Sequence, residues 1–173
     1  MRLRRKPWID DAIREYDAFV HLSGAEEYKG RWRSVFARPD APLWVELGSG
    51  KGNFISQMAV LHPEVNFIGI EIQTGVLYYA GKKCAEAEVS NVHLLKYDVA
   101  KIEDLFAPGE VDRFFINFCD PWPKSRHAKR RLTYRLFLDR WRREAWCCLS
   151  PIMPACSILR WKNSGSGTGR CQR

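Results

Sequence analysis

The sequence predicts an α/β protein built on a doubly wound, Rossmann-like parallel sheet. From residue 43 to residue 118, apolar segments of strand length alternate with longer segments of helical periodicity, and the loops between them are short. An acidic residue stands at or near the end of each of four successive strand segments: Glu46, Glu71, Asp98 and Asp120. Because parallel strands place their carboxyl ends along one edge of a sheet, the four acids are expected to share that edge.

The first 42 residues are expected to form a basic arm and a helical lead-in. Four cations open the chain: Arg2, Arg4, Arg5 and Lys6. Both a polyanion-binding arm and an ordinary charged terminus fit them. A helix is favoured over residues 9–22, because apolar side chains recur there at helical spacing, at Ile9, Ile13, Tyr16 and Val20. A second short helix is expected around residues 28–36.

Residues 43–47 predict the first strand of the main domain, and residues 53–61 predict the helix that follows it. The turn between them has glycine at alternate positions: Gly48, Gly50 and Gly52. Glycines permit positive φ and let a ligand approach the backbone closely. A carboxylate at Glu46 would repel a pyrophosphate but would suit a ligand that carries an ammonium group. Glu46 and Gly48 are therefore candidate cofactor-binding residues.

Residues 65–72 predict a second strand and residues 91–97 a third, with a helix over residues 73–88 between them. Glu71 follows the last glycine of the turn by 19 residues. That is close to the offset of about 20 residues at which an acid meets ribose hydroxyls in such folds. A strand-end glutamate exposed by chance is the alternative. Asp98, after the third strand, is a candidate acceptor for an adenine amino group.

A fourth strand, over residues 114–118, leads into Asp120 and the tripeptide P-W-P. Prolines so close together exclude both helix and ladder continuation, so the backbone must leave the sheet beside the acid. A basic cluster follows at Lys124, Arg126, His127, Lys129, Arg130 and Arg131. The ordinary interpretation is a capping aspartate and a solvated basic loop. The earlier glycine turn favours the other interpretation, a ligand site beside a phosphate-binding loop.

Composition restricts the class of partner. The chain has 173 residues and a net charge of +8, with a pI of about 9.3, which favours nucleic acid first and a membrane surface second. No apolar run is long enough to span a bilayer, and the basic N-terminus lacks an apolar signal core, so a cytoplasmic protein is expected. Six cysteines without C-x-x-C or zinc-like spacing predict reduced thiols and no metal site. His93 is interpreted as a packing or surface residue.

Several motifs resemble a known family. The segment V-E-L-G-S-G-K-G resembles the first motif of class I S-adenosylmethionine-dependent methyltransferases. The segment F-C-D-P-W-P-K-S-R-H-A-K-R-R-L-T resembles the signature of bacterial tRNA (guanine-N7-)-methyltransferases, which I-G-I-E-I-Q and L-T-Y-R-L-F-L-D also fit. The resemblance extends from about residue 2 to about residue 140. It implies methyl transfer from S-adenosyl-L-methionine to N7 of a guanosine in the tRNA variable loop.

The resemblance also implies roles for single residues. The four strand-end acids would face S-adenosylmethionine or the reaction centre, and Lys124 with the 125–131 loop would meet the tRNA. Guanine N7 carries no proton at neutral pH, so no strong general base is needed. Asp120 is therefore expected to be catalytic by holding the guanine N–H edge or the cofactor. Trp122 would stack on a base or pack under the loop.

The resemblance ends after residue 141. The family motifs H-F-K-T-D-N and T-x-Y-E are not found, and residues 147–173 contain no Asp or Glu but four of the six cysteines. We hypothesise a tail translated out of frame; a divergent tail is the alternative. The expected organisation is a lead-in over 1–42, a methyltransferase domain over 43–146 whose last strands are incomplete or altered, and a tail over 147–173. The alternative functions are a catalytically silent RNA- or nucleotide-binding domain and a nicotinamide-dependent dehydrogenase. The glycine spacing, which is not the G-x-G-x-x-G of dinucleotide folds, argues against the dehydrogenase.

Overall fold

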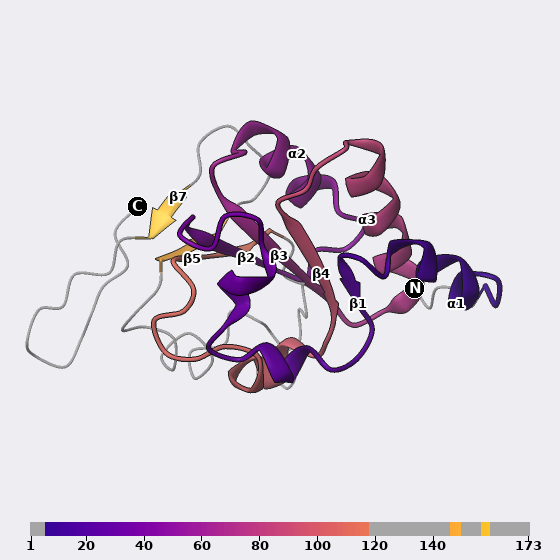
Figure 1. The fold of residues 1–173 in the computed structure, drawn as a ribbon, viewed down its shortest axis with the longest axis horizontal. Helices are drawn as coiled ribbons and strands as arrows, with labels where there is room; N and C mark the ends of the chain where they lie inside the picture. The colour runs from indigo at the N-terminus through magenta and orange to yellow at the C-terminus, as the bar shows by residue number, and fades with distance from the viewer. Residues whose placement is uncertain (1–5, 118–145, 150–156, 160–173) are drawn as a thin grey trace, which may run out of the picture.

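The computed structural model describes residues 6–117, 146–149 and 157–159, which are centred on a seven-stranded sheet (Figure 1). The strand order is β1-β4-β3-β2-β5-β6-β7; all neighbours are parallel except β6 and β7. The strands are β1 (Val20–His21), β2 (Leu43–Leu47), β3 (Asn66–Glu71), β4 (Val92–Lys96), β5 (Arg113–Ile116), β6 (Trp146–Leu149) and β7 (Ser157–Leu159). This is the doubly wound α/β sheet that the sequence predicts.

Helices and turns cover the two faces of the sheet separately. The α-helices are α1 (Ile9–Ala12), α2 (Asn53–Leu61) and α3 (Thr74–Glu86), and the 3-10 segments are η1 (Ile13–Tyr16), η2 (Ala25–Tyr28), η3 (Trp32–Val35) and η4 (Val99–Asp104). In Figure 1, α2 and α3 lie on one side of the sheet and the η2 and η4 turns on the other. The protein core is therefore divided into two apolar layers, one on each face.

Both layers are closely packed. Under α2 and α3, the buried side chains include Ile55, Leu77 and Cys84. On the opposite face the indole of Trp32 is fully buried, and its Nε1 donates to the backbone oxygen of Leu105 (2.8 Å). Each fully buried Leu or Ile side chain contributes about 1.5–3 kcal/mol relative to exposure. The N-terminal lead-in is thus an integral part of the core.

Most of the predicted elements are confirmed. The strand at 43–47 and the helix at 53–61 have the expected bounds, and the next three elements differ by one or two residues at their ends. The expected helix over 9–22 is wrong beyond residue 16, because Val20 and His21 form a strand that pairs with Leu94 and Leu95. This pairing gives hydrogen-bond partners to backbone groups at the outer edge of β4, and it buries Val20.

Between β2 and β5 the strand order changes direction once, and this indicates where a ligand binds. From β2 the chain steps outward through β3 to β4, and then returns to form β5 on the other side of β2. In open α/β sheets a crevice forms at the carboxyl ends of the strands where the order reverses. Here that point lies between β2, which carries Glu46, and β5, which Asn117 follows.

The last two strands, which the sequence left in doubt, are short but present. β6 has four residues and β7 has three, and they pair antiparallel through Cys147–Leu159, Cys148–Ile158 and Leu149–Ser157. The division of the chain after residue 146 stays a prediction. Among the described residues, no helix has the length and apolar character needed to cross a membrane.

Candidate functional site

The glycine turn between β2 and α2 forms the floor of the site. Its three glycines have φ of 72°, 56° and 74°, in the left-handed region that favours glycine. A Cβ on Gly52 would lie 2.8 Å from both Cα and Cβ of Ala80 in α3, whereas a Cβ on Gly50 would meet nothing within 4 Å. The backbone N–H of Ser49 donates to the Ile70 oxygen (2.9 Å) and fastens the turn to β3. The turn is therefore packed beneath and open above.

Glu71, at the end of β3, joins the turn to the sheet. Its Oε2 accepts from the backbone N–H of Gly50 (3.1 Å) and its Oε1 from that of Gln73 (3.0 Å). Each carboxylate oxygen can accept more than one hydrogen bond. The side chain is half-buried, so it can still accept from the hydroxyl groups of a ligand. The position agrees with a ribose contact, which stays a prediction.

Glu46 is buried beneath the turn, with 3% of its surface exposed. Its Oε1 accepts from Nδ2 of Asn117 (2.8 Å), which joins the ends of β2 and β5. The pKa of Glu46 is raised to about 8, mainly by burial. Hydrogen bonds with Asn117 and the Ile55 backbone lower it, and the charge of Glu71 raises it. Glu46 is thus largely protonated at neutral pH until a cation approaches.

Three polar atoms at this crevice are buried without a hydrogen-bond partner within the described part of the chain: Glu46 Oε2, Ser49 Oγ and Asn117 Oδ1. An unsatisfied buried polar group costs about 1–3 kcal/mol. Two of the three belong to one hydrogen-bonded pair, and the third belongs to the turn above it. When Glu46 is ionised, the cluster presents two acceptor oxygens and a hydroxyl group, and a ligand ammonium group has the right chemistry to donate to them.

Asp98 lies at the same edge of the sheet, two residues beyond Lys96, which pairs with Glu71. Its side chain is exposed, and its Oδ1 accepts from the backbone N–H of Ala100 (2.9 Å), which caps η4. Three of the four predicted acids are therefore brought to one edge. Asp120 and the predicted tRNA contacts at Lys124, Arg126, His127, Lys129 and Arg130 lie outside the described residues.

Sequence reasoning missed Asn117 and Ser49 as members of the site. Asn117 directly follows the last residue of β5, and a polar residue at that point of a switch crevice is a usable signal. Among the residues that the structure describes, no group of three His, Cys, Asp or Glu residues could hold a metal ion.

Comparison with known proteins identifies the family. A family model described as "Putative methyltransferase" matches residues 40–144. The tRNA (guanine-N(7)-)-methyltransferase of Bacillus subtilis (strain 168) is 48% identical over 141 residues, which are 82% of this chain and 65% of the relative. The enzyme of that name from Geobacillus kaustophilus (strain HTA426) is 53% identical over 138 residues, 80% of this chain and 63% of the relative.

The chain thus spans just under two thirds of the length of these relatives. A solved structure of an RNA methyltransferase from Salinibacter ruber, in complex with S-adenosyl-L-homocysteine, aligns with a TM-score of 0.43 and 20% identity over 87% of this chain and 72% of that chain. The matched family region covers more than half of the sequence and includes β2, the glycine turn, α2 and the Glu46–Asn117 pair. The chain therefore belongs to this family of methyltransferases.

Proposed function

We propose that the protein is an S-adenosyl-L-methionine-dependent tRNA methyltransferase that acts on N7 of a guanosine in the variable loop, in the cytoplasm. The observation that carries the proposal is the buried Glu46–Asn117 pair at the switch point, whose unpartnered oxygens lie at the carboxyl ends of β2 and β5 beside the glycine turn. The relatives that are identical to it at about half of the aligned positions are named as tRNA (guanine-N(7)-)-methyltransferases, which supports the substrate.

The residues present fit this cofactor. Glu46 and Asn117 offer acceptors for an ammonium group, the glycine turn offers space above Gly50, and Glu71 offers acceptors for ribose hydroxyls. Asp98 offers an acceptor at the far end for an adenine amino group. S-adenosylmethionine, when bound, supplies a methyl group that its sulfonium sulfur has already activated.

The chain's own residues then have to position and shield the reactants. Because guanine N7 presents a lone pair and no proton, no side chain must act as a strong base. Holding two reactants in alignment can supply about 7–11 kcal/mol of a barrier. We assign this holding role to Asp120, at the guanine N–H edge or the cofactor, and assign contacts with tRNA phosphates to the basic segment from Lys124 to Arg130.

The direct test is transfer of labelled methyl groups from S-adenosylmethionine to an unmodified tRNA transcript. We expect incorporation into the variable loop, and none when the target guanosine is replaced by 7-deazaguanosine, which lacks the acceptor nitrogen. Incorporation into the 7-deaza transcript would contradict N7 as the target. Binding of both cofactor and tRNA without any transfer would instead favour the silent RNA-binding alternative.

The same assay tests Asp120. We expect Asp120→Ala to abolish methyl transfer, because alignment of the base or the cofactor is lost, while S-adenosylmethionine still protects the variant from thermal unfolding. The matched control is Asp112→Ala, which removes a carboxylate that accepts from the Leu43 N–H and Arg33. Near-normal turnover in Asp120→Ala would exclude the assigned role.

A further inference from the structure

A second feature of the molecule lies beside the glycine turn. A cavity of about 510 Å³ opens between the N-terminal segment, the start of α3 and the end of β4. Three lysines from three separate parts of the chain line it: Lys6, Lys51 and Lys96. Asp10 is the one carboxylate among the described lining residues. Cations therefore exceed anions in this lysine pocket, as in a site for a negatively charged ligand.

Tyr79 of α3 contacts two of the three lysines of the pocket. Lys6 Nζ donates to its hydroxyl (2.9 Å) and lies 5.6 Å from its ring centroid, and Lys51 Nζ lies 5.6 Å from the same centroid. The pKa of Tyr79 is lowered, first by the hydrogen bond from Lys6 and then by the charges of Lys6, Lys51 and Lys82. The hydroxyl therefore lies in a positive field, which an anion in the pocket would share.

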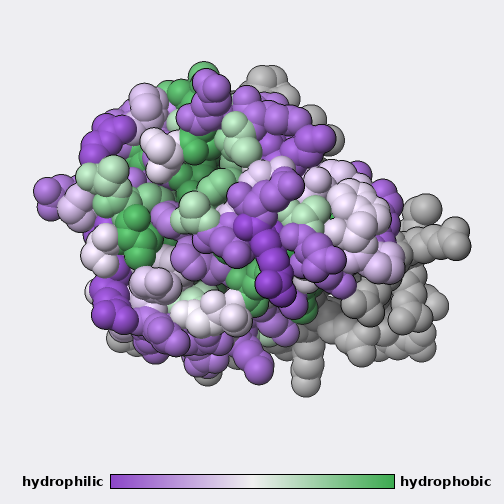
Figure 2. Space-filling model, turned by 45° about the vertical axis from the view of Figure 1, so that its right-hand side comes forward, coloured by the Kyte–Doolittle hydropathy of each residue, from purple (hydrophilic) through white to green (hydrophobic). Residues whose placement is uncertain are grey.

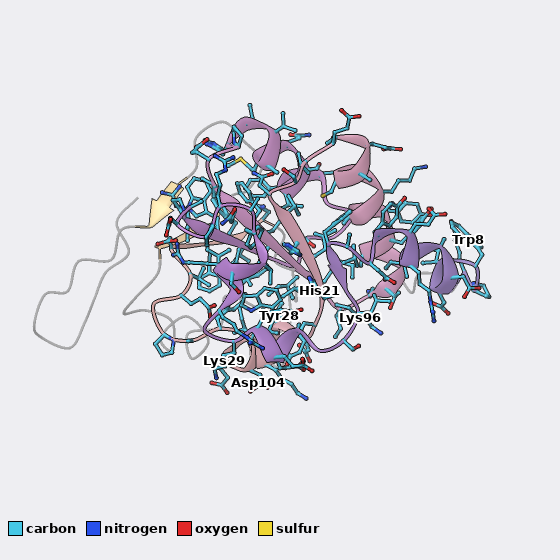
Figure 3. All side chains as sticks on the ribbon, in the orientation of Figure 1. Trp8, His21, Tyr28, Lys29, Lys96 and Asp104 are labelled. Atoms are coloured by element: carbon cyan, nitrogen blue, oxygen red, sulfur yellow. The ribbon has the colours of Figure 1, made fainter. Side chains whose placement is uncertain are left out.

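Aromatic rings lie beside Lys6 of the pocket. Trp8 is 51% exposed, packs edge-on against Tyr78 (5.3 Å between centroids), and lies 5.9 Å from Lys6 Nζ. In Figure 3, Trp8 lies at the α1 end of the molecule. Figure 2 turns that side of the molecule forward, and hydrophilic residues cover much of the face that it shows. Cations interleaved with exposed aromatic rings are typical of nucleic-acid surfaces, where phosphates pair and bases stack.

The lysine pocket lies beside residues that are candidates for cofactor binding. Lys51 lies between two glycines of the turn that floors the cofactor crevice, and Lys96 pairs in register with Glu71. The lysine pocket therefore lies next to the proposed cofactor site, on the α3 side of the turn. A nucleic acid that presents a base to the cofactor brings its flanking phosphates close to this site.

We propose that the lysine pocket formed by Lys6, Lys51 and Lys96 binds a backbone phosphate of the tRNA substrate, in addition to the phosphate contacts assigned to the basic segment 124–131. The proposal rests on the proposed function for the identity of the RNA. It assigns the N-terminal lead-in a part in substrate binding, because Lys6 and Trp8 belong to it.

The test uses the double variant Lys6→Gln/Lys96→Gln in the full chain, with an unmodified tRNA transcript as the probe. The control is Lys29→Gln, which removes one charge of the same kind at an exposed site near Asp104, away from Trp8 (Figure 3). We expect the double variant to weaken tRNA binding about tenfold at low salt and to lower the slope of log affinity against log salt by about 0.7–0.9 for the lost phosphate. S-adenosylmethionine affinity, measured by calorimetry, should change less than twofold.

Each outcome has a definite meaning. Equal tRNA affinity and salt slope in the double variant and in Lys29→Gln would overturn the proposal, as would a wild-type protein that fails to bind tRNA. If the substitutions weaken binding of pyrophosphate or of anionic phospholipid vesicles but not of tRNA, the RNA assignment is wrong. If tRNA binding weakens as expected but the wild type transfers no methyl group, the pocket stands and the proposed function fails.

Discussion

At the scale of the residue, burial of Glu46 decides when its carboxyl group can carry a charge. A ligand ammonium group placed beside it would favour the ionised form, so below about pH 8 binding releases up to one proton. Above about pH 8 the ligand's own α-amino group loses its charge. The need to deprotonate Glu46 therefore weakens binding below about pH 8, and the loss of the ligand's positive charge weakens binding above that pH.

We therefore expect the affinity for S-adenosylmethionine to rise about tenfold per pH unit at most up to about pH 8, and then to fall. In Glu46→Gln the rising limb should disappear, because the amide does not titrate, and the affinity should be lower throughout. Calorimetry in two buffers of different ionisation enthalpy would measure the proton released. Proton release from the variant equal to that from the wild type would exclude Glu46 as its source.

At the scale of the element, the glycine turn and α3 are fitted to each other. The positive φ of Gly50 and of Gly52 would strain an alanine equally, by about 1–2 kcal/mol. Only at Gly52 would the added Cβ also meet the backbone of α3, at Ala80, and overpacking of this kind costs about 1–3 kcal/mol more.

We accordingly expect Gly52→Ala to lower the free energy of unfolding by about 2–5 kcal/mol and Gly50→Ala by about 1–2 kcal/mol, measured by urea denaturation. Gly50→Ala is the internal control, because it has the backbone strain without the collision. Equal losses in the two variants would show that α3 does not constrain the turn.

Elements with a strong local pattern could be predicted from the sequence, and elements that depend on distant partners could not. The strand at 43–47 and the helix at 53–61 carry their own periodicity and a glycine turn between them. β1 has two residues, too few to show any period, and it exists because the edge of β4 accepts it. Likewise Asn117 contacts Glu46 across 71 residues, and no local pattern encodes that distance.

At the scale of the whole molecule, buried titratable groups on both faces of the sheet determine how stability depends on pH. The His21 and His93 rings bond to each other (2.9 Å), and burial lowers both pKa values, that of His93 to about 4. Their neutral forms stabilise the fold above pH 6.5, and this contribution is lost as the pH falls towards 4. Glu46 acts in the opposite direction: its contribution is present below pH 4.5 and is lost as the pH rises through 8.

From pH 4.5 to 6.5 these two contributions oppose each other, and above pH 6.5 only that of Glu46 still changes. We expect the free energy of unfolding of Glu46→Gln, relative to wild type, to grow with pH by at most about 1.4 kcal/mol per unit until pH 8. Urea denaturation at several pH values measures this difference. The control is Glu86→Gln, an exposed partner of Lys82, for which little change is expected. A pH-independent difference for Glu46→Gln would contradict the raised pKa.

The two-residue strand β1 also affects how the protein interacts with other protein molecules. An uncovered strand at the border of a sheet presents free N–H and C=O groups to which a foreign strand can add, and such addition begins aggregation. Val20–His21 occupies that border beside β4, and the Phe19 oxygen accepts from the Leu94 N–H (2.8 Å). A border strand this short offers a foreign chain little to pair with. The lead-in therefore protects β4, so that solubility in a crowded cell depends partly on a segment outside the catalytic motifs.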